Sequence, residues 1–186
     1  HTVRIHVSHE LNGGDGYSYT LANGTELKGA RVSFFDIDTG MHKIKDSGLA
    51  YETIFDRRFL EVTNASQINE DGNGINGFTR FCSGQLVEEG DDNFEDTIYL
   101  TNEEPGDSSF HPHGGSLWAL DIKRGELHAV PAAGRANWEN TAALGFPGER
   151  VALLMGDDKA PAPLWLYIGR KTASIYEIKN ALPRGL

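Results

Sequence analysis

Three short runs of β-forming residues end in acidic side chains, and this pattern constrains the fold more than any other feature of the sequence. The runs cover residues 4–10, 97–104 and 151–158. All three are short runs typical of β-strands, and the first, residues 4–10, alternates apolar and polar residues. If the ends of several strands meet, a cation or a proton must offset the clustered carboxylate charge. The pattern therefore predicts an all-β protein with a metal site where these strands end.

Two hairpins form a second repeat. The predicted strand pairs are residues 30–37 with 41–44 and residues 115–122 with 126–130. Asp36 and Asp121, at matching places in the two hairpins, lie 85 residues apart, and Trp118 and Trp165 lie 47 residues apart. Spacings near 47 residues and near twice that value are typical of the blades of a β-propeller, which are roughly 40 to 50 residues long. We expect the acidic runs to be the inner strands of successive blades.

The length of the chain limits how complete such a propeller is. At this period, 186 residues make about four blades, which is the lower limit for a closed propeller. We therefore expect residues 1–186 to be a single segment of an incomplete propeller, completed by missing blades or by a second chain. The sequence begins at His1, as expected for a piece of a longer protein or after removal of a leader. Short helical turns are predicted only at residues 55–62 and 174–181.

Composition excludes several classes of partner. The chain is 39% hydrophobic with 22 Gly and 7 Pro, which indicates a folded, turn-rich protein. Its formal charge of -10 argues against nucleic acid or an anionic membrane surface as a partner, because the net field repels both. No apolar stretch approaches the roughly 20 residues that span a bilayer. Cations are the expected counter-species.

The acidic strand ends supply most of the candidate metal ligands. Adjacent side chains of an extended chain point in opposite directions, so one member of each acidic pair is expected to face the site and the other to face solvent or cap a turn. Glu10 precedes a Gly-rich loop whose oxygens suit calcium, with an ordinary polar turn as the alternative. Glu139 follows Trp138, which is expected to wall the site. The candidate carboxylates are Glu10, Glu103, Glu104, Glu139 and Asp158.

Cys82 is the only cysteine, and it has two interpretations. A lone cysteine is most often a small buried apolar residue. Arg80 lies two residues earlier and is expected to lower the pKa of the thiol, which makes Cys82 a candidate thiolate ligand for a transition metal. His111 and His113 form either a metal-binding pair or part of a surface loop.

Taken in order, five short motifs resemble the PhoX family of alkaline phosphatases and its phosphatase-like relatives. The motifs are residues 9–10, 80–84, 99–104, 134–140 and 155–158. The resemblance implies a large β-propeller that holds iron and calcium and hydrolyses small phosphate esters outside the cytoplasm, in the periplasm or the extracellular space. It also implies particular ligands: Cys82 and one of Glu103 and Glu104 for iron, Glu139 as a further carboxylate ligand, and Glu10 and Asp158 for calcium.

The chain also departs from the PhoX pattern. Trp138 stands where the family often has His, and Phe81 stands where the family commonly has the first of two consecutive cysteines. PhoX chains are far longer. Other functions therefore stay open: a noncatalytic calcium-stabilised propeller that binds a ligand or a protein, a calcium-dependent esterase or lactonase, and a structural subunit of a larger assembly.

Overall fold

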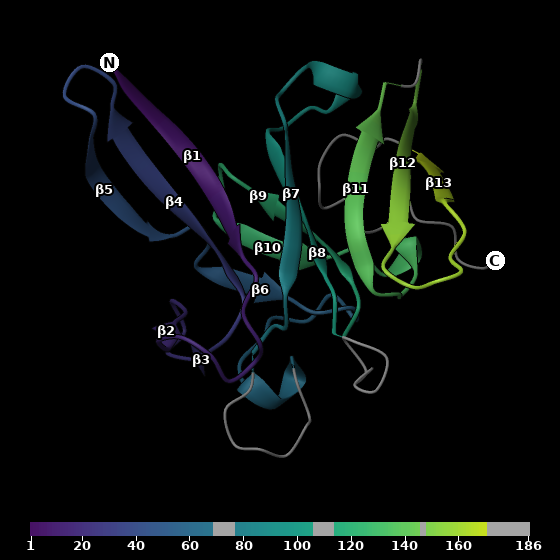
Figure 1. Cartoon of the computed structure of the whole chain (residues 1–186), viewed down its shortest axis with the longest axis horizontal. Coiled ribbons are helices and arrows are strands. Elements are labelled where there is room, and N and C mark those ends of the chain that lie inside the picture. Colours follow the sequence, from purple (N-terminus) through teal and green to yellow (C-terminus); the bar gives the residue numbers. More distant parts are fainter. Residues whose placement is uncertain (69–76, 106–113, 146–147, 171–186) are drawn as a thin grey trace.

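The chain is all-β in the computed structural model, which describes residues 1–68, 77–105, 114–145 and 148–170 (Figure 1). The first part of the chain forms β1 (Thr2–His9), β2 (Tyr19–Thr20), β3 (Glu26–Leu27), β4 (Arg31–Asp38), β5 (Lys43–Leu49) and β6 (Thr53–Phe55). The middle part forms β7 (Phe81–Val87), β8 (Ile98–Glu103), β9 (Leu117–Asp121) and β10 (Glu126–Ala129). The last part forms β11 (Trp138–Leu144), β12 (Arg150–Asp157) and β13 (Trp165–Arg170). The helical elements of the described residues are three single 3-10 turns: η1 (Ala65–Gln67), η2 (Asp91–Asn93) and η3 (Pro131–Ala133).

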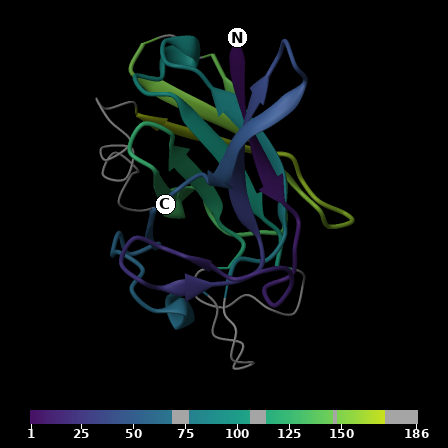
Figure 2. The ribbon, with the colours of Figure 1, turned by 90° about the vertical axis from the view of Figure 1, so that its left-hand side faces the viewer.

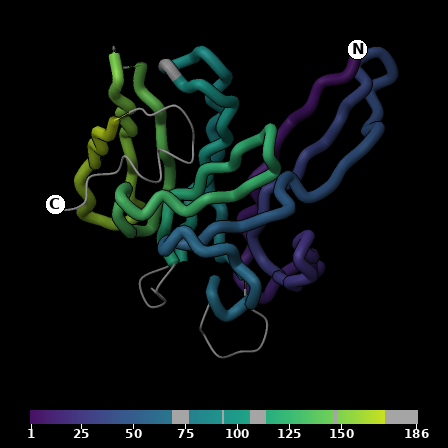
Figure 3. Tube along the Cα trace, turned by 180° about the vertical axis from the view of Figure 1, so that it is seen from behind, coloured from purple at the N-terminus to yellow at the C-terminus, as the bar shows by residue number. Residues whose placement is uncertain are grey.

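In the described part of the chain, three larger sheets and one small ribbon make up the fold. The first sheet has the order β1-β4-β5, the central sheet β6-β10-β9-β8-β7, and the third sheet β11-β12-β13, while β2 and β3 form the ribbon. Neighbouring strands are antiparallel except β6 and β10. Because β6 follows β5 in the chain but pairs with β10, it links the first sheet to the central one, as the view from behind shows (Figure 3).

The three sheets come together at β7. This strand is the edge of the central sheet, and it contacts β1 of the first sheet and β11 of the third. Figure 1 shows β7 between the other two sheets, and Figure 2 shows the first sheet in front of the central one. The edge strands β1, β7 and β11 therefore line one region of the molecule and, counted outward from it, are the first strands of their sheets.

Two hydrophobic clusters fill the spaces between the sheets. One packs the first sheet against the central sheet around Val32, Phe78 and Trp118, and the other packs the central sheet against the third around Leu100 and Met155. The middle of the central sheet therefore has apolar neighbours on both faces. As a result all six residues of β8 are buried, including the acidic residue at its end. Because β8 is covered on both faces, the carboxylate of Glu103 at its end lies in the interior of the protein.

Both predicted hairpins are confirmed, as β4 with β5 and as β9 with β10. The helical turn predicted at residues 55–62 is wrong. Phe55 ends β6 and forms a β-bridge with Glu61, because the buried carboxylate of Asp56 accepts the backbone N–H groups of Arg58 and Leu60 and closes a turn between them. The second predicted turn, at residues 174–181, lies outside the described residues.

The positions of the acidic runs correct one expectation. Only residues 4–10 form an edge strand, β1, whereas residues 97–104 and 151–158 form β8 and β12, the second strands of their sheets. The prediction that all three are inner strands was wrong. Likewise Asp36 lies on a second strand and Asp121 on a third, while Trp118 and Trp165 both lie on third strands. The 47-residue spacing therefore joins equivalent strands, and the 85-residue spacing does not.

No helix among the described residues is long and apolar enough to cross a membrane.

Candidate metal centre

Five of the six predicted ligands converge at one end of the three sheets. Strands β1, β8 and β12 end there, and strands β7 and β11 begin there. In Figure 1 these positions are at the lower ends of the strands. The five residues are Glu10, Cys82, Glu104, Glu139 and Asp158.

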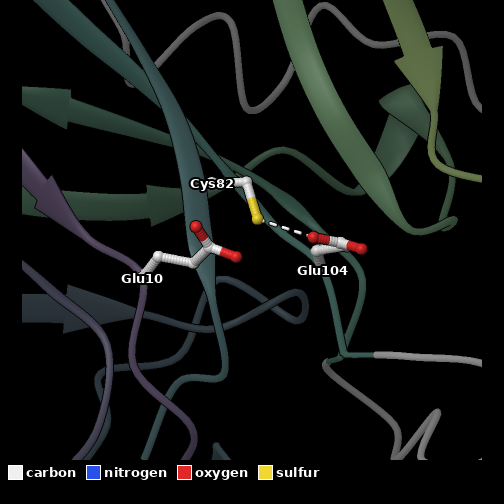
Figure 4. Close-up of side chains that lie close together, drawn as sticks. All are labelled: Glu10, Cys82 and Glu104. Atoms are coloured by element: carbon white, nitrogen blue, oxygen red, sulfur yellow. Dashed lines mark hydrogen bonds between the residues drawn. The ribbon is translucent and has the colours of Figure 1, made fainter.

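The first group within this cluster joins the first sheet to the central sheet. Ligand atoms of Glu10, Cys82 and Glu104 all lie within 4.8 Å of one another. The Cys82 thiol donates to Oε2 of Glu104 at 2.6 Å. Figure 4 shows the three side chains pointing toward one another from three separate segments.

The second group joins the central sheet to the third sheet. Ligand atoms of Glu104, Glu139 and Asp158 also lie within 4.8 Å of one another. Glu104 is thus common to both groups, and at 4% exposure it is the buried centre of the cluster, whereas Glu139 and Asp158 are exposed. The arrangement offers donor atoms for more than one cation around a single shared carboxylate.

Local backbone structure places these side chains in the same way on two sheets. β7 pairs with β8, and β11 with β12, but the register shifts by one residue at Cys82 and Ser83 in the first pair and at Glu139 in the second. A β-bulge of this kind re-aims a side chain and is common beside functional sites. Cys82 and Glu139 therefore occupy equivalent bulges.

Strands β8 and β12, which pair with β7 and β11, also place their acidic residues in equivalent positions. Glu104 and Asp158 each come directly after the second strand of their sheet. The backbone N–H of Glu104 donates to the carbonyl of Arg80 at 3.0 Å, and that of Asp158 donates to the carbonyl of Asn137 at 2.8 Å. Each of these bonds fixes an acidic residue beside the bulge of the neighbouring strand. The central and third sheets thus supply the same two positions to the cluster.

Arg80 holds Glu104 rather than activating the thiol. Its guanidinium donates to Oε1 of Glu104 at 2.9 Å and to the Glu104 carbonyl at 2.8 Å, and its own N–H donates to the carbonyl of Leu11 at 2.7 Å. Arg80 has a φ of 45°, a left-handed value that is uncommon for a residue with a side chain. The arginine therefore ties the loop after β1 to the end of β8.

The expectation that Arg80 lowers the pKa of the Cys82 thiol was wrong. Burial raises the pKa of this thiol, and the hydrogen bond and negative charge of Glu104 and the charge of Glu10 raise it further. Burial also raises the pKa of Glu104; Asp158 adds to this effect, while Cys82 and Arg80 oppose it. Without a bound cation, the crowded acidic groups thus favour a protonated thiol.

Glu103 lies away from the cluster, although the sequence predicts it as a ligand equally with Glu104. Its side chain is fully buried, and one carboxylate oxygen accepts the backbone N–H of Thr79 at 3.1 Å. The other oxygen, Oε2, has no hydrogen-bond partner among the described residues. Burial raises the pKa of Glu103 to about 8, against the opposing effect of nearby N–H groups. The non-ligand member of this pair is therefore buried, where solvent or a turn cap was expected.

The sequence also gives expectations for the pair Asp157 and Asp158, for Trp138, and for His111 and His113. In the other acidic pair, Asp158 joins the cluster, whereas Asp157 is half-buried and its Oδ1 accepts the backbone N–H of Asn137 beside the neighbouring strand at 3.2 Å, where solvent or a turn cap was expected. Trp138 does not wall the site; it is 3% exposed and packs in the second hydrophobic cluster. His111 and His113 lie outside the described residues. The role predicted for Arg80 was also wrong: it directly precedes β7 and binds Glu104, and its position two residues before Cys82 was the available signal that it lies near the cluster.

The donor set suits cations of two kinds. Carboxylate oxygens from Glu10, Glu104, Glu139 and Asp158 are the ligands of hard ions such as calcium, whereas a thiolate favours a transition metal such as iron. Among the described residues, Arg80 is the one cationic side chain that forms an ion pair with this cluster. One positive charge does not balance four carboxylates, so the residues present fit the binding of metal ions.

Comparison with known proteins places no relative beside this chain: no family model, no curated protein and no solved structure matches it.

Proposed function

We propose that the cluster of Glu10, Cys82, Glu104, Glu139 and Asp158 is a calcium- and iron-binding centre of the PhoX-like type that hydrolyses small phosphate monoesters. The observation that carries the proposal is the position of Glu104, a buried carboxylate common to two groups of donor atoms that each lie within 4.8 Å. Burying a carboxylate beside other acids is costly unless positive charge offsets it. Bound cations would supply that charge.

Each residue would have a defined task. Cys82 and Glu104 would hold iron through sulfur and oxygen, and Glu10, Glu139 and Asp158 would hold calcium through oxygen. Arg80 keeps Glu104 oriented through its ion pair. When bound, the metal ions would polarise phosphoryl oxygens and promote attack by an oxygen nucleophile.

We also propose that the three sheets are blades of a β-propeller whose other blades lie outside these 186 residues or on a second chain. The first strands of the sheets are neighbours, and the central and third sheets repeat the same bulge and the same acidic position. Repeated antiparallel sheets around a common axis are the plan of a propeller. The natural setting would be periplasmic or extracellular, as the resemblance to PhoX implies.

Adjacent residues give a matched test of the catalytic proposal. The protein would be loaded with iron and calcium, and release of p-nitrophenol from p-nitrophenyl phosphate would be followed. We expect Glu104→Gln to abolish turnover and Glu103→Gln, one residue away, to retain it. Native mass spectrometry of the same sample would detect a second chain.

Three outcomes would count against the proposal. Turnover by the metal-free protein would exclude the cluster as the source of activity. Calcium binding without turnover would favour the noncatalytic propeller. Hydrolysis of lactones or carboxylic esters in place of phosphate esters, with no effect of changing Cys82, would favour the esterase.

A further inference from the structure

A second concave site lies on the solvent side of the first sheet, on the opposite face of β4 from the hydrophobic core. It is a cavity of about 320 Å³, which is near the lower end of the size range of small-molecule sites. Strands β4 and β5 form its floor, and residues 17–19 and the end of β1 bound it. Its wall includes Tyr17, Tyr19, Arg31, Ser33, Phe35 and Ser47.

The cavity differs in charge from the metal cluster. None of the described residues that line it is acidic, although the chain as a whole has 27 acidic and 17 basic residues. Side chains alternate across β4, so Arg31, Ser33 and Phe35 face the cavity while Val32 packs in the core. In an acidic protein, Arg31 thus lies in a patch whose described lining carries no negative charge.

Arg31 is the cationic group of this patch. Its guanidinium donates to the carbonyl of Tyr17 at 2.9 Å and lies 5.8 Å from the centre of the Tyr19 ring. It makes no salt bridge with any carboxylate in the described part of the chain, whereas four other arginines there do: Arg4, Arg58, Arg80 and Arg124. Most N–H donors of Arg31 thus have no protein acceptor within the described residues.

We propose that this cavity binds a small aromatic monocarboxylate through Arg31. The planar fork of a guanidinium matches the two oxygens of a carboxylate. Tyr19 and Phe35 offer rings against which a flat apolar body packs. A single arginine balances one negative charge, whereas a phosphate dianion would add an unbalanced charge to a chain of net charge -10.

Calorimetric titration with benzoate tests this site in the intact chain. A chelator in the buffer removes metal ions, so that benzoate cannot bind as a metal ligand. We expect saturable binding at one site, weakened roughly tenfold or more by Arg31→Gln because a charge-assisted pair is lost. Arg4→Gln is the matched control, since Arg4 lies on the same sheet but pairs with Asp36 at 2.7 Å, and it is expected to leave binding unchanged.

Further probes separate the possible outcomes. Benzamide, which has the ring without the charge, is expected to bind much more weakly than benzoate, and so is inorganic phosphate. Amide resonances of residues 33–35 and 47–49 should shift during the titration. Glu104→Gln, which removes the shared carboxylate of the metal cluster, should leave benzoate binding intact. The benzoate proposal and the proposed catalytic centre can therefore be refuted separately.

Equal benzoate affinity in the wild type and Arg31→Gln would overturn the proposal. So would benzamide or phosphate binding as tightly as benzoate, the absence of saturable binding, or resonance shifts confined to residues outside the cavity. Circular dichroism of each variant confirms that a loss of binding is not a loss of fold.

Discussion

Glu103 gives a sharp prediction, because it is a fully buried acid whose pKa is raised by burial to about 8. In the unfolded chain the same group titrates near its ordinary value of 4.5. At pH values between 4.5 and about 8, Glu103 is therefore protonated in the folded protein but ionised in the unfolded chain. Folding stability contributed by Glu103 is therefore fully present at low pH and is lost as the pH rises from about 4.5 to about 8.

The size of the effect follows from the difference in pKa. Each unit of difference in pKa between the folded and unfolded states corresponds to about 1.4 kcal/mol of unfolding free energy. Between pH 5 and pH 9, ionisation of Glu103 therefore lowers the unfolding free energy by about 4 kcal/mol. Glu103→Gln replaces the acid by a neutral amide that resembles its protonated form. We expect the free energy of unfolding of the wild type to fall by about 4 kcal/mol more than that of Glu103→Gln across this range.

Urea unfolding at a series of pH values measures this difference. The metal-free protein is used, so that other titrating groups contribute equally to both proteins and cancel. Glu52→Gln, an exposed site, is the control and should follow the wild type. If the wild type and Glu103→Gln lose stability in parallel, the inferred burial of an ionisable Glu103 is refuted.

Two further predictions concern the cluster. Cys82→Ala should abolish iron binding but retain calcium, with a change in the unfolding free energy of the metal-free protein of about 1 kcal/mol; normal iron content by elemental analysis would refute the thiolate assignment. Metal binding should release protons and tighten as the pH rises, because burial and neighbouring acids raise the pKa values of Cys82 and Glu104; calorimetry in buffers of different ionisation enthalpy would show no proton release if this is wrong.

Much of the candidate metal centre could be predicted from the sequence. The strands at residues 97–104 and 151–158 end in acids at equivalent places in neighbouring sheets, and both acidic ends reach the cluster. The alternation rule selected one acid in each pair, although it did not say which. The all-β class and both hairpins followed from the same alternation and from the Gly-containing turns.

The rest depended on features that leave no mark in residue alternation. The bulges at Cys82 and Glu139 change the register by one residue, and only the pairing of neighbouring strands reveals them. The burial of Glu103 depends on the two clusters that cover β8, and the ion pair of Arg80 depends on a long-range contact with Glu104. These outcomes are set by tertiary packing.

The metal content of the purified protein tests the central claim most directly. The wild type, Glu104→Gln and Glu103→Gln would be incubated with iron and calcium, passed over a desalting column and analysed by inductively coupled plasma mass spectrometry. The shared position of Glu104 predicts that the wild type and Glu103→Gln retain both metals and that Glu104→Gln loses them. A wild type that holds neither metal, or a Glu104→Gln protein that retains as much as the wild type, would contradict the assignment of this cluster as a metal centre.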